Sequence, residues 1–188
     1  MQRKYDICAL CVIGVLTFLL VFGFSLTETN FSVIGNREGR KALLLAWGAL
    51  VGNYGYLYMD TLMKRAECTD LWVRTFLLAS LFLLIAGVGI PYWPKKLPRL
   101  SRLHVMISFS APVCMAIAQL RFLLLMQKRT GTIWKLQWGM QLVLGAGSVI
   151  LFFSLGMVSS LLEIFVTFSV CLYLLLLDHR LEKISDNL

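Results

Sequence analysis

Residues 136–177 read LQWGMQLVLGAGSVILFFSLGMVSSLLEIFVTFSVCLYLLLL, and Glu163 is the single charged side chain in these 42 residues. A helix rises about 1.5 Å per residue and the hydrocarbon core of a bilayer is about 30 Å thick, so the run is too long for one crossing and suits two. The segment from Gly156 to Ser160 offers small and polar residues for a tight turn. We therefore predict two spans here, 136–156 and 160–177.

The composition of the whole chain agrees with this membrane assignment. Hydrophobic residues make up 59% and charged residues 15%, with a mean hydropathy of +0.77. An ordinary soluble domain has about 45–50% apolar and about 25% charged residues. The 188 residues leave room for about six spans of about 20 residues, and so for a single membrane domain over 1–188.

Four further apolar runs precede residue 136, and they predict spans at about 7–26, 42–59, 75–92 and 104–126. Polar and charged links separate them. The link 91–102 holds three of the four prolines, which lack the backbone N–H, so it is not expected to form a lipid-exposed helix. The predicted fold is an all-α polytopic integral membrane protein, a six-transmembrane-helix bundle with short loops.

The basic residues indicate an orientation and a class of partner. With both termini in the cytoplasm, ten Lys and Arg residues fall on the inner side and seven on the outer side, which favours this topology in a cell membrane. The net charge of +8 comes from short clusters between apolar runs. We interpret these clusters as contacts with membrane lipids and do not expect a nucleic-acid partner.

Small residues in two of the predicted spans indicate close helix packing. Gly48 and Gly52 are four residues apart in span 42–59, with Gly55 one turn further on, and Gly145 lies in span 136–156. Glycine lets a second helix approach closely. The partner helix is either within this chain, or belongs to a homo-oligomer or another membrane protein.

Three strongly polar side chains fall inside predicted spans and are candidates for burial. Asn53 lies in span 42–59, and Gln119 and Arg121 lie in span 104–126. Polar groups in hydrocarbon need a partner. Interhelical hydrogen bonds would satisfy the two amides. Arg121 would either extend to the headgroups or pair with an anionic lipid or substrate group.

One grouping of acids and a histidine is expected at the outer boundary. Glu163 follows the predicted outer turn, His104 begins a span on the same side, and Glu28 and Glu38 lie in the polar loop above them. Histidine titrates near neutrality, and a desolvated glutamate has a raised pKa, so such a group could bind a cation, relay protons or act as acid and base. The structural alternative is an interfacial histidine with a glutamate paired to nearby Lys or Arg.

Motifs for metal or cofactor chemistry are not found. The second histidine, His179, lies in the predicted tail, and the chain has no H-E-x-x-H, Walker A, G-x-S-x-G or dinucleotide motif. Cys8 and Cys11 match C-x-x-C, but within an apolar span. We predict no catalytic residues, no metal and no cofactor.

Two short patches resemble a known family. The string Asn30 to Asn36, NFSVIGN, precedes span 42–59, and Arg102-Leu103-His104 opens span 104–126 with Gln119 further along it. This layout resembles the small six-span Frag/DRAM-like membrane proteins. The resemblance implies a compact six-helix bundle with an outward-facing polar first loop, and it implies no catalytic mechanism.

Three functions stay open at this point. The first is a non-catalytic accessory or regulatory bundle that binds lipid or a partner membrane protein. The second is a small carrier or channel subunit with a polar path along Asn53, Glu163 and His104. The third is an intramembrane lipid-modifying enzyme, which would need His104 and Glu163 to converge with a nucleophile such as Ser101, Ser108 or Ser110.

Overall fold

The computed structural model of the chain describes residues 2–131 and 134–185. Within these ranges the chain forms helices and no strand, which confirms the predicted all-α fold. The helices are α1 (Gln2–Val21), α2 (Phe31–Arg37), α3 (Lys41–Arg65), α4 (Leu71–Gly89), α5 (Pro98–Thr130), α6 (Lys135–Leu155) and α7 (Ser160–Ser185).

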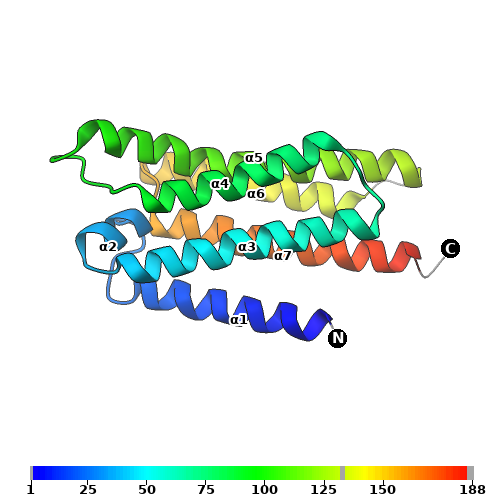
Figure 1. Cartoon of the computed structure of the whole chain (residues 1–188), viewed down its shortest axis with the longest axis horizontal. Coiled ribbons are helices and arrows are strands. Elements are labelled where there is room, and N and C mark those ends of the chain that lie inside the picture. The colour runs from blue at the N-terminus through cyan, green and yellow to red at the C-terminus, as the bar shows by residue number, and fades with distance from the viewer. Residues whose placement is uncertain (1, 132–133, 186–188) are drawn as a thin grey trace.

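The long helices run along one axis, and the short helix α2 lies at one end of the bundle (Figure 1). We call this the α2 end, and we call the opposite end, where α1 begins and α7 ends, the terminal end. Helix α3 packs against α1, α4 and α7; α4 packs along α5, and α6 pairs with α7.

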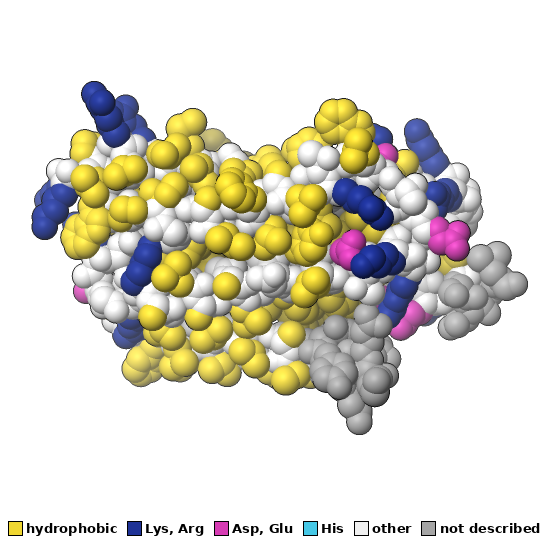
Figure 2. All heavy atoms as spheres, in the orientation of Figure 1, with side chains coloured by type: hydrophobic (Ala, Val, Ile, Leu, Met, Phe, Trp, Pro, Cys, Tyr) yellow, Lys and Arg dark blue, Asp and Glu magenta, His cyan; other side chains and the backbone are white. Residues whose placement is uncertain are grey.

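Four helices are long and apolar enough to cross a membrane: Leu71–Gly89, Pro98–Thr130, Lys135–Leu155 and Ser160–Ile184. Helix α1 contributes a shorter apolar stretch, Ile7–Val21. On the face drawn in Figure 2, hydrophobic side chains cover the middle of the molecule, and charged side chains gather towards its two ends. This distribution suits a membrane protein whose long axis crosses the bilayer.

Several helix ends differ from the predicted spans. Helix α1 ends at Val21, not at residue 26, and Gly23 then adopts a positive φ of 84°. Helix α5 begins at Pro98, six residues before the predicted span 104–126, because a proline needs no N–H at the first helical position. Helix α7 continues through the predicted tail to Ser185, and the polar segment before α3 contains the unpredicted α2.

Helix α3 occupies the centre of the bundle. It is not among the four helices that are long and apolar enough to cross a membrane, because glycines, tyrosines and Asn53 interrupt its apolar run. Its buried residues are Leu44, Trp47, Gly48, Gly52, Gly55, Tyr58, Met59, Leu62 and Met63. Neighbouring helices cover much of α3, so it needs less apolar surface than a helix that faces lipid on most sides.

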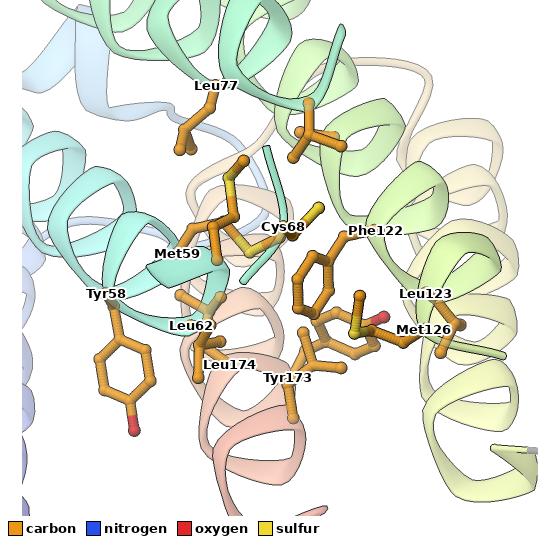
Figure 3. Close-up of a cluster of buried hydrophobic side chains, with 14 of the residues drawn as sticks. Tyr58, Met59, Leu62, Cys68, Leu77, Phe122, Leu123, Met126, Tyr173 and Leu174 are labelled. Carbon is orange, nitrogen blue, oxygen red and sulfur yellow. The ribbon is translucent and has the colours of Figure 1, made fainter. Parts of the chain in front are cut away.

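Two hydrophobic clusters form the core. One lies near the α2 end and joins α1, α2, α3 and α4 through Leu20, Phe31, Leu44, Trp47 and Val88. The other lies towards the terminal end, where side chains from α3, α4, α5 and α7 point toward one another (Figure 3). Met59, Leu62, Phe122 and Leu174 in this second cluster are fully buried, so these helices hold one another in place.

The glycines of α3 permit close contact with α4 and α5. A Cβ atom added at Gly48 would lie 2.8 Å from Val88 Cγ2, and one added at Gly55 would lie 3.0 Å from Met115 Cε. Gly52 faces α4 at similarly short range. These glycines therefore serve packing within the chain.

Gly145 differs from these glycines: it does not pack against a helix of this chain, and the alternative, contact with a second chain, stays a prediction. It is exposed, and a Cβ atom there would meet nothing within 4 Å. The buried residues of α6 are Gln137, Gln141 and Leu144, all in the first half of the helix. Beyond them α6 lies at the edge of the bundle, where Gly147 approaches Phe165 of α7.

Replacing Gly48 by valine should destabilise the protein, because the new side chain would overlap Val88. Overpacking of this kind costs about 1–3 kcal/mol. Gly145→Val makes the same chemical change at an open site and serves as the control. We expect a lower midpoint of thermal unfolding in detergent for Gly48→Val alone; equal shifts for both variants would contradict the close packing of α3.

Candidate functional site

The predicted acid and histidine site lies at the α2 end, and its glutamate caps a helix. Glu163 Oε2, from α7, accepts a hydrogen bond from the backbone N–H of Phe31 at 2.7 Å. Asn30 caps the same helix, because its Oδ1 accepts from Val33 N at 2.8 Å. First-turn N–H groups have no partner within their own helix, and these two oxygens provide acceptors for α2.

His104 also contacts α2, and it joins this helix to the end of α4. Its Nδ1 lies 3.1 Å from the carbonyl oxygen of Ile90, and its Nε2 lies 2.7 Å from Ser32 Oγ. A carbonyl only accepts, so Nδ1 donates. Nε2 of the neutral ring then accepts a hydrogen bond from the Ser32 hydroxyl. The ring is 3% exposed and packs beside Tyr92. His104 is thus a buried link between the end of α4 and α2.

Lysine and arginine side chains satisfy the helix carbonyls at the same end. Arg40 Nη1 donates to the carbonyl oxygens of Leu19, Leu20 and Phe22 at the end of α1, at 2.8–2.9 Å. Lys41 Nζ donates to the carbonyl of Val88 near the end of α4 at 2.6 Å. Cations near helix C-termini are favourable because they complement the carbonyl dipoles.

Glu28 and Glu38 do not join this site, so the prediction that groups them with His104 and Glu163 is wrong. Both side chains are exposed. Glu38 stands at the C-cap of α2, where its backbone N–H bonds to Ile34. The acids point to solvent because the loop folds its apolar residues, led by Phe31 and Ile34, into the core.

The geometry at the α2 end suits anchoring better than acid–base chemistry. His104 and Glu163 contact adjacent residues of α2, and within residues 2–131 and 134–185 no hydrogen bond joins the two side chains. The three candidate nucleophiles have other contacts. Ser108 packs against Gly87 of α4, Ser101 Oγ accepts from the backbone N–H of Trp93, and Ser110 Oγ donates to the carbonyl of Met106. His104 and Glu163 hold the first loop to the bundle.

A pair of buried glutamines links α5 to α6 in the interior. Gln141 Nε2 donates to Gln119 Oε1 at 3.0 Å, and Gln119 is fully buried. In the described part of the chain, Gln119 Nε2 is buried without a hydrogen-bond partner, and the hydroxyl of Tyr173 is buried beside Gln141. Buried polar atoms of this kind mark a place where water or a polar ligand group would be stabilised.

Asn53 and Arg121 are both exposed, which corrects the prediction of burial. Asn53 Nδ2 donates to the carbonyl of Ala49 in its own helix at 2.7 Å, so its amide needs no second helix. Arg121 pairs with Asp70, the N-cap of α4, through Nε and Nη2 at 2.8 and 2.7 Å. This bidentate hydrogen bond lowers the pKa of the Asp70 carboxyl below its ordinary value.

A cavity of about 280 Å³ lies at the terminal end, between the first turn of α6 and the last turns of α7. Gln137 Nε2 donates to the carbonyl of Leu176 at 3.2 Å and joins the two helices there. The Arg180 guanidinium lies over the Trp134 ring, 5.9 Å from its centroid. The residues around the cavity include Trp134, Lys135, Gln137, His179, Arg180 and Lys183.

The sequence prediction missed this cavity because it ended the last span at residue 177. The predicted tail includes His179, Arg180 and Lys183, whereas in the structure these residues belong to α7, which ends at Ser185. The available signal was helical spacing: Leu176, Arg180 and Lys183 follow one another at intervals of four and three residues, on one face. An antiparallel α6–α7 hairpin places that face beside the start of α6.

No family model, curated protein or solved structure matches this chain. The resemblance to Frag/DRAM-like proteins therefore stays a prediction.

Glu163→Met should loosen α2, because it leaves the N–H of Phe31 without its acceptor. A buried N–H that loses its acceptor costs about 1–3 kcal/mol, so amide hydrogen exchange in residues 31–37 should quicken by about tenfold or more. Glu163→Gln keeps an acceptor oxygen and serves as the control. Unchanged exchange in Glu163→Met would contradict the anchoring role.

Proposed function

We propose that this chain is a non-catalytic integral membrane protein that binds membrane lipid and acts as an accessory or regulatory bundle. In this proposal α1 and α3 cross the bilayer with α4, α5, α6 and α7, giving six spans in the cell membrane. Both termini then lie in the cytoplasm, and α2 caps the outer face. The lysines and arginines of the terminal end then lie on the inner side.

The cavity between α6 and α7 is the observation that carries this proposal. It lies near the ends of α6 and α7, which the proposed topology places at the depth of the lipid headgroups, and it combines an aromatic wall with polar and basic groups. The alternative site at the α2 end offers less for a ligand, since both nitrogens of His104 and one carboxylate oxygen of Glu163 already have hydrogen-bond partners.

A second function, a small carrier or channel subunit, has one observation in its favour. The buried pair Gln119 and Gln141, beside Tyr173, places amide and hydroxyl groups inside the bundle, and a polar path would need such groups. Solute-dependent flux through proteoliposomes of the purified protein would favour this reading.

Native mass spectrometry of the gently solubilised full chain tests the proposed function. We expect lipid to stay bound at collision energies that remove detergent, and we expect His104→Ala to retain it, because His104 lies at the opposite end from the cavity. A wild-type protein free of lipid at all energies would contradict lipid binding. Loss of lipid in a folded His104→Ala variant would place the site at the α2 end instead.

A further inference from the structure

The cavity at the terminal end has a positive lining. Lys135, Arg180 and Lys183 contribute cationic side chains, and the lining includes no carboxylate from the described residues. The two acidic residues of α7 near the cavity interact with other side chains. Asp178 accepts from Arg65 Nη1 at 2.6 Å, and Glu182 Oε2 lies 4.0 Å from His179 Nδ1. The cavity is therefore suited to an anion.

Arg180 is a partly buried cation in this lining. Its Nε atom is buried, and no acceptor among residues 2–131 and 134–185 forms a hydrogen bond with it. A buried charged N–H without an acceptor costs free energy. The guanidinium is held over Trp134, whose own Nε1 donates to Thr130 Oγ1 at 3.2 Å. Because Arg180 also lines the cavity, its guanidinium offers an oxyanion there a charged donor.

The first turn of α6 adds backbone donors. Trp134 is the N-cap of this 21-residue helix and makes no side-chain capping hydrogen bond. The N–H groups of a first helical turn have no acceptor within the helix, and they carry the positive end of the helix dipole. Lys135 and Gln137, both in this turn, line the cavity. Phosphate groups bind at helix N-termini for the same reasons.

An apolar stripe leads from the cavity along α6. Leu136 lines the cavity and is 60% exposed; Val143 and Ile150 follow at intervals of seven residues and are 54% and 63% exposed. A spacing of seven is about two helical turns, so the three side chains share one face. The cavity itself, at about 280 Å³, suits a headgroup, and the stripe offers an acyl chain a surface to follow.

We propose that this cavity binds the phosphate group of an anionic membrane lipid. The Arg180 guanidinium and the first-turn amides of α6 donate to the phosphate oxygens, Lys135 adds positive charge, and an acyl chain lies on the stripe of Leu136, Val143 and Ile150. This assignment rests on the proposed lipid-binding function and specifies its site and its lipid class.

A native mass spectrometry titration tests the site with the full chain. The probes are phosphatidylglycerol and phosphatidylcholine with the same acyl chains, and inorganic phosphate as a soluble competitor. The variants are Arg180→Gln and Lys135→Gln, with Lys128→Gln as the control, because Lys128 is an exposed cation near the end of α5 and does not line the cavity.

We expect the wild type and Lys128→Gln to bind phosphatidylglycerol about tenfold more tightly than phosphatidylcholine, as a charge-assisted hydrogen bond would give, and Arg180→Gln to lose this preference. An equal loss in Lys128→Gln would overturn the site. If Arg180→Gln loses its helical circular dichroism, Lys135→Gln decides by the same comparison, because it leaves the contact between Arg180 and Trp134 intact.

The remaining outcomes separate the two proposals. Wild-type protein that binds both lipids equally well would overturn the anionic site and leave the lipid-binding function standing. Wild-type protein that binds neither lipid would overturn both. Displacement of phosphatidylglycerol by an equal concentration of inorganic phosphate would assign the cavity to a soluble phosphate compound and overturn the lipid assignment.

Discussion

A helix that ends at a membrane boundary leaves carbonyl or N–H groups without partners, and these groups need hydrogen bonds from elsewhere in the protein. At the α2 end, the segment between α1 and α3 meets much of this need. Arg40 and Lys41 donate to the ends of α1 and α4, and the carbonyls of Leu26 and Thr29 accept from the first amides of α7. In return Glu163 of α7 caps α2, so the loop and the bundle stabilise each other.

The position of α3 follows from the same need to give polar groups partners inside the protein. Exposing a helix with several polar residues to lipid costs free energy. At the centre of a bundle the same helix avoids lipid, and its small residues allow neighbouring helices to pack closely. Gly48, Gly52 and Gly55 bring α4 and α5 close, and Trp47 donates from its ring nitrogen to Thr17 of α1 at 3.1 Å. The proposed six-span arrangement depends on this central helix, whereas the cavity forms between the first turn of α6 and the last turns of α7.

Apolar runs predict the helices well, because a span must be both long and apolar, but they predict helix ends and contacts poorly. The tail after residue 177 reads as polar, yet it continues α7, since helix formation does not stop where apolar character stops. Gln119 shows that a polar residue in an apolar run can be buried, whereas Asn53 bonds to its own helix and stays exposed. The sequence could not predict that Arg180 lines a cavity, because this depends on the start of α6. That segment is distant from Arg180 in the sequence and adjacent to it only in the folded hairpin.

The most direct test of this account is the membrane topology of α3, the central helix with the weakest apolar signal. A cysteine is introduced at Glu38 or at Lys64, exposed positions on either side of the helix. Its labelling by a membrane-impermeant maleimide is compared with the labelling of the wild-type chain. The account predicts that Glu38→Cys is labelled in intact cells and that Lys64→Cys is labelled only after the membrane is opened. Labelling of both positions from the same side would show that α3 does not cross, and would contradict the six-span bundle.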